Sequence, residues 1–285
     1  MKTRLIFAAV LALSTVWATG SRAAPEQAGA PIVAAERAFA AFAAEHGWIT
    51  AFKNYAAPNG VIIANGKITN AHDYFDAQQS SGSKSLKWWP AVALIARSGD
   101  LGFTTGPYSI DDSGRIQGQY FTVWKLQPDG RWLWLFDGGS GTEEPVAIPR
   151  DGPVAEFEAS AHRRSSERAA LAAVARLEAR HALAGSLAGL VARNARILRP
   201  GRPPATRDAA PREMVFPTPS ISYLPAERAF ASRSGDLVFT LGPARWPQES
   251  GTALSGHYAR IWQITSSGWR IVFDELLPRP AASGS

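Results

Sequence analysis

The pattern of apolar positions is most strongly that of β-strands between Gly118 and Gly139. Two runs rich in β-branched and aromatic residues flank the segment 127–130, Gln-Pro-Asp-Gly, in which Pro and Gly supply turn dihedrals. This pattern predicts a long β-hairpin. A similar stretch, with Tyr, Trp, a Gly turn, Trp and Phe-Asp in the same order, recurs from Gly256 to Leu276. The chain is therefore expected to contain one type of sheet twice.

The segments before the two hairpins also repeat. SGDLGFTTGP occupies residues 98–107, and SGDLVFTLGP occupies residues 234–243. A chain of 285 residues has room for two domains of about 100 residues each. We expect these domains at 26–140 and 154–278. The segment 141–153, rich in Gly, Pro and Glu and without periodicity, is expected to link them.

The first half combines helical patterns with strands. Residues 34–45 are Ala-rich with Phe39 and Phe42 on one face, residues 48–55 continue as a second helix, and Asn70 can cap a third helix over 71–79. A short strand is expected at 61–64 and another at 86–97. This order predicts an α+β fold in which helices pack on a strongly bent antiparallel sheet and form a cone with an apolar mouth.

The second half departs from this pattern outside its sheet. Residues 154–192 have a helical composition. Residues 198–219 contain six prolines, a density that predicts irregular structure in place of the strand, turn and helix of the first half. We therefore expect a degenerate second cone and a better formed first one.

The N-terminus has the pattern of an export signal. A basic start at residues 1–4 precedes the apolar run 5–16, which is shorter than the approximately 20 residues that a membrane span needs. Small residues at Ser21 and Ala23 then fit a signal peptidase site. The sequence predicts a signal peptide at 1–23, cleaved after Ala23 or Ala24, with an uncleaved anchor as the alternative. The mature chain is expected in the periplasm or outside the cell, without a membrane anchor.

Composition excludes several classes of chemistry. The chain has no cysteine, so disulfides and thiol chemistry are excluded. Its net charge of +6 falls to +3 when Lys2, Arg4 and Arg22 leave with the signal peptide. Most of the remaining positive charge is arginine between 150 and 212, and the arginines of the expected helix, at 163, 164, 168, 176 and 180, are mixed with glutamates. A solvated helix face fits this pattern better than a nucleic-acid surface, which would need a basic patch with exposed aromatic residues.

Several motifs of the first half resemble the NTF2-like superfamily, specifically its SnoaL-like, DUF4440-type proteins. The motifs are AERAF at 35–39, LKWWP at 86–90, SGDLGFTTGPY at 98–108, Gly118-x-Tyr120 with Trp124, and Asp129-Gly-x-Trp132 through Gly139. The resemblance implies a cone fold and a pairing of the two copies through their sheets, as in a dimer. The superfamily contains isomerases, cyclases, dehydratases and proteins that only bind, so the fold implies no reaction.

Enzymes of this superfamily place a carboxylate or a His inside the cone, and three residues are candidates for such a role. Asp137 is on the last strand of the hairpin, expected on one face with Leu133 and Leu135. Tyr120 could donate to an oxyanion, and His72 begins the third helix. Each also has a structural interpretation: a strand-end cap for Asp137, a packed tyrosine with a satisfied hydroxyl for Tyr120, and a surface residue for His72.

Aromatic residues are the expected ligand contacts. Trp88 and Trp89 are adjacent in a predicted strand, so one should face the cone and the other should face away. The full set of candidate ligand-binding residues is Trp88, Trp89, Phe39, Phe42, Tyr108 and Tyr120.

No motif predicts a cofactor or a metal. Ser81-x-x-Lys84 lacks its companion motifs, and Glu178-x-x-His181 lacks the partners of a helical metal site. We therefore expect binding of a small apolar or amphipathic molecule in the first cone, without catalysis. The alternatives are an isomerase, cyclase or dehydratase using Asp137, Tyr120 or His72, and an interaction module with filled cones.

Overall fold

The computed structural model describes residues 29–111, 115–141, 149–150, 152–157, 160, 165–215, 221–247 and 253–279. The predicted signal peptide and residues 142–148 of the predicted linker lie outside these residues. Among the helices that are described, none is long and apolar enough to cross a membrane.

The first half consists of three helices and a bent sheet. Its elements are α1 (Ala30–His46), α2 (Trp48–Tyr55), β1 (Ala56–Ala64), β2 (Lys67–Asn70), α3 (Ala71–Asp76), β3 (Lys87–Trp88), β4 (Val92–Ile95), β5 (Leu101–Ser109), β6 (Gly118–Leu126), β7 (Trp132–Gly141) and β8 (Ala155–Glu156). The strand order is β2-β1-β7-β6-β5-β4-β8, and β3 also pairs with β5. All strand pairs are antiparallel except β1 with β7 and β8 with β4.

The second half follows the same order. Its elements are α4 (Glu167–Arg180), α5 (Ala184–Leu187), η1 (Ala188–Leu190), β9 (Val191–Leu198), β10 (Ala205–Thr206), η2 (Arg207–Ala209), α6 (Ala210–Met214), β11 (Ser222–Tyr223), β12 (Arg228–Ala231), β13 (Leu237–Pro247), β14 (Ala253–Thr265) and β15 (Gly268–Pro278). The sheet order β10-β9-β15-β14-β13-β11 repeats that of the first half. The α+β class, with two cones of helices on bent sheets, is confirmed.

Two expectations for the second half are wrong. Residues 154–192 begin with β8, which pairs in parallel with β4 of the first sheet, and α4 begins only at Glu167, where the Ser166 side chain accepts from the amide of Ala169. The strand, turn and helix that were expected to be lost are also kept: β9 ends at Leu198, where the proline-rich segment begins, and that segment contains β10 and α6. Two of its prolines fall where proline is tolerated, since Pro200 lies in a turn and Pro211 in the first turn of α6.

The strand predicted over residues 86–97 is divided in two. β3 ends at Trp88 and β4 begins at Val92, with Pro90 between them. Proline has no amide hydrogen for a ladder bond, so the chain leaves the sheet at this point and returns two residues later. The Asn70 cap is confirmed, because its side chain accepts from the amides of His72 and Asp73.

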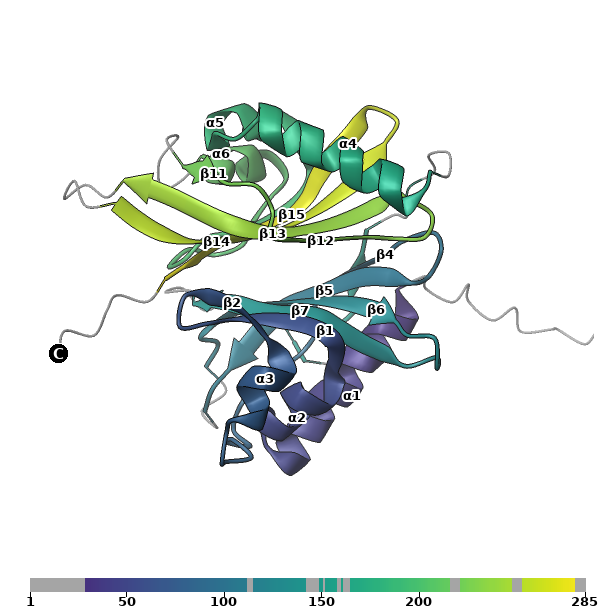
Figure 1. Ribbon diagram of the computed structural model, residues 1–285. Helices are drawn as coiled ribbons and strands as arrows, with labels where there is room; N and C mark the ends of the chain where they lie inside the picture. Colours follow the sequence, from purple (N-terminus) through teal and green to yellow (C-terminus); the bar gives the residue numbers. More distant parts are fainter. Residues whose placement is uncertain are drawn as a thin grey trace, which may run out of the picture.

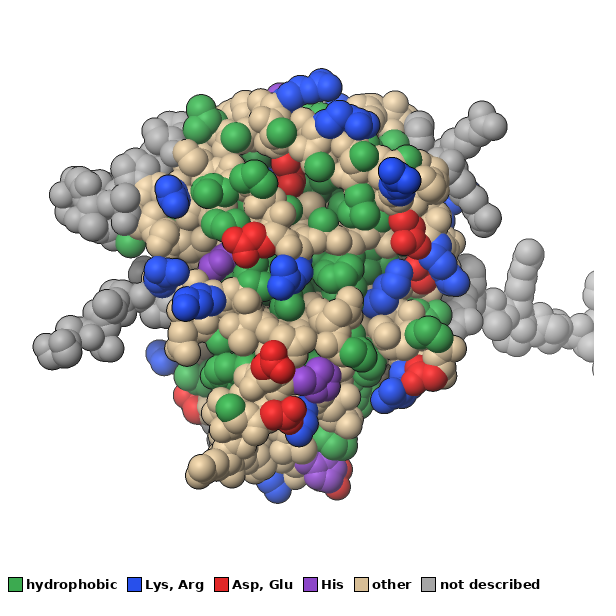
Figure 2. Space-filling model, viewed as in Figure 1, with side chains coloured by type: hydrophobic (Ala, Val, Ile, Leu, Met, Phe, Trp, Pro, Cys, Tyr) green, Lys and Arg blue, Asp and Glu red, His purple; other side chains and the backbone are tan. Residues whose placement is uncertain are grey.

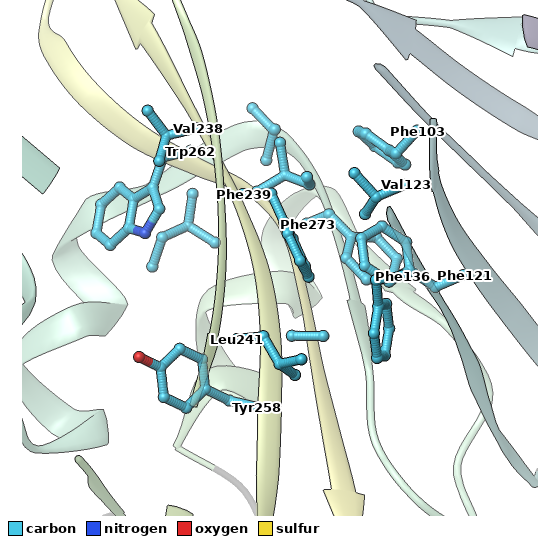
Figure 3. Close-up of a cluster of buried hydrophobic side chains, with 14 of the residues drawn as sticks. Phe103, Phe121, Val123, Phe136, Val238, Phe239, Leu241, Tyr258, Trp262 and Phe273 are labelled. Carbon is cyan, nitrogen blue, oxygen red and sulfur yellow. The ribbon is translucent and has the colours of Figure 1, made fainter. Parts of the chain in front are cut away.

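The two sheets pack face to face, with the helices of each half on the outside (Figure 1). Aromatic side chains from both sheets form the centre of this interface (Figure 3). Phe121 stacks on Phe273 at 4.0 Å between ring centroids, and Phe136 stacks on Phe239 at 5.5 Å. Burial of these rings removes a large apolar area from water, which stabilises the sheet-to-sheet pairing.

At one end of the interface, the repeated Ser-Gly-Asp-Leu turns bind each other reciprocally. The amide of Arg97 donates to Asp236 at 3.1 Å, and the amide of Arg233 donates to Asp100 at 3.2 Å. The Ser98 and Ser234 hydroxyl oxygens lie 2.8 Å apart, and each accepts from the other residue's amide. Such matched contacts are those of a two-fold interface, here within one chain.

Candidate functional site

A β-bulge determines which way Asp137 faces. On β6 and β7, Val123 pairs with Phe136 while Trp124 pairs with Trp134, so Leu135 is an extra residue on β7. A one-residue insertion moves the following side chains to the opposite face of a strand. Asp137 therefore shares the inner face with Trp134, and the prediction that it shares a face with Leu133 and Leu135 is wrong. Those two leucines belong to the core between the sheets.

The first cone encloses a cavity of ≈ 830 Å³. This volume is within the range of about 300–1,000 Å³ that is typical of small-molecule sites. Its walls are largely aromatic and aliphatic, and its rim includes three residues from the end of the second half. Its lining includes Trp48, Trp88, Tyr108, Tyr120, Asp137 and Arg279.

Tyr120 and Asp137 form the polar end of this cavity. Tyr120 pairs with Gly139 and Thr122 pairs with Asp137, so the two polar side chains are diagonal neighbours on one face. The Thr122 hydroxyl donates to Asp137 Oδ2 at 2.6 Å. The Tyr120 hydroxyl makes no hydrogen bond within the described part of the chain, although Tyr120 is only 6% exposed. It is a donor available to a ligand.

Burial favours the neutral form of both groups. Desolvation, followed by the neighbouring charges of Glu36 and Glu275, raises the pKa of Asp137 well above its usual value. Desolvation and the charge of Glu36 likewise raise the pKa of Tyr120 well above 10. The cavity therefore favours a phenol and a protonated carboxyl, and both can donate hydrogen bonds to a ligand oxygen.

A buried carboxyl group lies behind these residues. Glu36 on α1 accepts from Trp88 Nε1 at 2.5 Å, from Trp124 Nε1 at 3.1 Å and from the Thr104 hydroxyl. Desolvation outweighs these hydrogen bonds and raises the pKa of Glu36 to about 7. Glu36 is fully buried and does not line the cavity. It fixes the indole of Trp88 against the cone and adds negative charge behind Asp137.

The equivalent carboxyl groups of the second cone are ion-paired. Arg260 Nε binds Asp274 at 2.7 Å, and Arg260 Nη1 binds Glu178 at 3.2 Å. Arg199 Nη2 binds the other oxygen of Asp274 at 2.8 Å. The guanidinium of Arg260 also stacks over the rings of Tyr223 and Tyr258, at 4.5 and 4.6 Å from their centroids. These contacts place two guanidinium groups beside Asp274, where the first cone has an open space beside Asp137.

The register identifies the positions at which the cones differ. Thr122 pairs with Asp137 in the first sheet, and Arg260 pairs with Asp274 in the second. Gly139 pairs with Tyr120, whereas Leu276 pairs with Tyr258. Arg260, Leu276 and Met214 are at most 1% exposed. The second half retains a hollow of ≈ 600 Å³ between α4 and the strands β11–β13, and Glu178 and Arg260 are among its lining residues.

The structure brings only some of the predicted site residues together. Trp88, Tyr108, Tyr120 and Asp137 line the first cavity. Phe39 packs within the aromatic core at 4.8 Å from the Trp88 ring, and Phe42 packs on His46. Trp89 lies outside the cavity lining, under the guanidinium of Arg150 at 4.9 Å. His72 Nε2 is 3.3 Å from the carbonyl of Ala56, also outside the lining.

Sequence reasoning missed Glu36 and Thr122. Glu36 stands three residues before Phe39, on the face of the helix that turns to the core, where a lone carboxyl is unusual. Glu178 stands at the same place relative to its own sheet, and Trp262 binds it at 2.9 Å as Trp124 binds Glu36. Comparison of the two halves would have identified this pair. Among the described residues, no cluster of three or more His, Cys, Asp or Glu side chains is arranged to hold a metal ion.

Comparisons with known proteins give similarities of fold. No family model matches the chain, and no curated protein matches it. Among solved structures, it is similar to an NTF2-like protein of unknown function from Shewanella oneidensis, with 17% identity, a TM-score of 0.30, and coverage of 38% of this chain and 95% of the other.

Two further structures are similar at the same level. A ketosteroid isomerase-like protein from Erwinia carotovora atroseptica has 16% identity and a TM-score of 0.30, with 40% of this chain and 94% of the other covered. A Mycobacterium tuberculosis protein solved in complex with estradiol-17β-hemisuccinate has 13% identity and a TM-score of 0.29, with 39% and 91% covered. Similarities this distant assign neither a ligand nor a reaction.

Proposed function

We propose that the first cone binds a small apolar or amphipathic molecule that carries a hydrogen-bond-accepting oxygen. The observation that supports this proposal best is the contrast between an aromatic cavity ending at Tyr120 and Asp137 and a second cone in which Arg199 and Arg260 occupy the equivalent space. An apolar wall provides affinity, and the two neutral donors orient the ligand's oxygen.

The proposal extends to the origin and location of the chain. We propose that it is a tandem of two NTF2-like domains of the SnoaL-like type, and that only the first retains a ligand site. The shared order of elements and the reciprocal Ser98 and Ser234 contacts support a duplicated domain. Export to the periplasm or beyond, with cleavage after Ala23 or Ala24, remains part of the proposal on the basis of the N-terminal sequence.

Native mass spectrometry of the mature chain tests the binding role. The protein, purified from the compartment in which it accumulates, is expected to carry a small molecule that is released on denaturation. A Trp48→Ala variant should lose this molecule, because Trp48 lines the cavity. Trp89→Ala removes the same side chain outside the lining and should retain it. An unliganded wild-type protein that no metabolite extract stabilises thermally would contradict the proposal.

A second candidate function is proton-transfer catalysis, which one observation favours. Two groups with raised pKa, Tyr120 and Asp137, meet in one cavity, and Glu36 with its pKa of about 7 lies behind them. Binding fits better, because Asp137 is the only carboxyl group in the described lining, so no second acid or base faces it across the cavity. Deuterium incorporation into the recovered ligand in D₂O, abolished by Asp137→Asn, would establish catalysis.

A further inference from the structure

A second hollow adjoins the rim of the first cavity. It measures ≈ 540 Å³ and lies between β2 of the first half and β13 and β14 of the second. Gly66 and Arg279 line both hollows, so the two spaces meet at this point. Basic side chains gather along the level at which the two halves meet (Figure 2). A ligand that fills the first cone therefore reaches a site of different chemistry at its rim.

Arg279 is fixed at the junction by the turn between β1 and β2. Its Nη2 donates to the carbonyl of Gly66 at 3.0 Å. Gly66 has φ +69°, and a Cβ at this position would lie 2.3 Å from Arg279 Nε. Only glycine combines this backbone conformation with so close an approach of the guanidinium. The turn thus binds a cationic side chain that the second half contributes.

The second hollow is positively charged. Lys67, Arg245 and Arg279 line it, against the single carboxylate of Glu227. His257 also lines it, is 7% exposed, and has an Nδ1 atom without a hydrogen-bond partner among the described residues. A buried, unpartnered polar atom beside three cations is a feature of a site that receives a polar ligand group.

The inner end of the first cavity disfavours an anion. Asp137 and Glu36 lie there without a cationic partner among the described residues, so a negatively charged group of a ligand would be buried beside two carboxyl groups with no positive charge to pair with. In the second cone, Arg260 supplies that cation, but the first has Thr122 in its place. Among the described lining residues, the only cation is Arg279 at the rim. An anionic group of a bound molecule is therefore directed outward.

We propose that the ligand is an anionic amphiphile. Its apolar body lies in the first cone, and its carboxylate or phosphate head lies in the second hollow, bound by Arg279, Lys67 and Arg245. This inference rests on the proposed function, since it specifies the class of molecule that the first cone binds. It also gives the second half a role in recognition, because Arg245 and Arg279 both belong to it.

Calorimetric titration with three probes tests the inference. Dodecanoate, dodecyl phosphate and dodecanol share one apolar chain and differ in the head group. The two anions should bind at least about tenfold more tightly than the alcohol, as expected for charge-assisted hydrogen bonds. The tighter of the two anions identifies the head group as a carboxylate or a phosphate.

Substitution at the rim should remove this preference. Arg279→Met should weaken both anions about tenfold and change dodecanol binding by less than about twofold. Lys67→Met should act in the same direction with a smaller effect, because Lys67 lines only the second hollow and its ammonium lacks the paired donors of a guanidinium. Arg176→Met, an exposed arginine on α4 outside both hollows, is the matched control and should change nothing.

The outcomes separate the inference from the proposed function. Equal affinity for the three probes, unchanged in Arg279→Met, would overturn the anionic head group and leave the apolar site intact. Failure of the wild-type chain to bind any probe would count against both. Binding of inorganic phosphate with the same affinity as dodecyl phosphate would also contradict the inference, because the apolar body would then contribute nothing.

Discussion

The two cones share one scaffold and differ in how each accommodates its buried carboxyl groups. Each holds a glutamate on its first helix, bound by a strand tryptophan, and an aspartate after a β-bulge of its last strand. In the second cone, Arg260 pairs with both carboxylates. In the first, Thr122 occupies that position, and burial raises the pKa of both carboxyl groups, which favours their neutral forms.

This difference shows that the same fold can satisfy buried acids in two ways. A guanidinium neutralises them with charge and fills the interior, which leaves no room for a ligand beside Asp274. Protonation neutralises them without adding atoms, so the space beside Asp137 stays open. The pairing by Arg260 stabilises structure, whereas the protonated pair leaves donors available to a bound molecule.

The largest expected effect comes from removing the cation of the second cone. Arg260→Met leaves Glu178 without its cation and Asp274 with Arg199 alone, so we expect a loss of about 3–5 kcal/mol in the free energy of unfolding. Urea denaturation measures it. Arg176→Met should change stability by less than about 0.5 kcal/mol. Adding Glu178→Gln to Arg260→Met should recover part of the loss, and no recovery would contradict this origin of the effect.

The next largest effect is a difference between Glu36 and Glu178 in how each contributes to the pH dependence of stability. The raised pKa of Glu36 means that the folded protein holds this proton from pH 4.5 to about 7 while the unfolded chain has lost it. Stability is therefore full below about pH 4.5 and falls by about 3 kcal/mol as the pH rises through 7. Glu36→Gln cannot ionise, so its stability should fall less over this range.

The matched change in the second cone should behave oppositely. Glu178→Gln weakens the partner of the buried Arg260 and should lower stability relative to wild type at about pH 8, where Glu36→Gln raises it. Denaturation at about pH 5 and about pH 8 compares the two variants. If both substitutions change stability in the same direction at about pH 8, the two cones do not differ in this way.

Transferring the cation to the first cone should close it. Thr122→Arg places a guanidinium beside Glu36 and Asp137, as Arg260 lies beside Glu178 and Asp274. We expect ligand affinity to fall at least about a hundredfold, about 2.7 kcal/mol, without loss of folding. Calorimetric titration with dodecanol measures it. Thr122→Val is the control. It removes the hydroxyl group without adding a charge and should retain binding.

The smallest effects come from the paired tyrosines. Tyr120→Phe removes a hydroxyl that has no partner in the described structure, so we expect ligand affinity to fall by about 1 kcal/mol and stability to change little. The Tyr258 hydroxyl donates to Glu178 at 3.3 Å and to the Leu224 carbonyl at 3.2 Å. Tyr258→Phe should therefore lower stability by about 1 kcal/mol and leave ligand affinity unchanged.

Much of the fold could be predicted because it depends on local patterns. The hairpin of β6 and β7, the Asn70 cap and the α+β class follow from periodicity and turn residues. The proline-rich segment could not be predicted well, because counting prolines does not show where each one falls in a turn. The position of β8 beside β4 depends on pairing between distant segments, which a local pattern does not contain.

The site was only partly predictable, for a similar reason. Tyr120, Trp88 and Asp137 were identified as candidates, but the orientation of Asp137 depended on the bulge at Leu135, which alternation alone does not indicate. The environment of Glu36 depends on its hydrogen bond with Trp124, a residue 88 positions away in the chain. The rim combines Gly66 with Arg279 across the two halves, a contact that neither segment predicts.

The most direct test is a crystal structure with a brominated dodecanoate, located by the anomalous signal of bromine. The account predicts a bromine peak inside the first cone, among the aromatic walls beside Tyr120 and Asp137, and no peak beside Asp274. A peak beside Asp274, or equal occupancy of the two cones, would contradict the claim that one cone is open because it lacks the cation that fills the other.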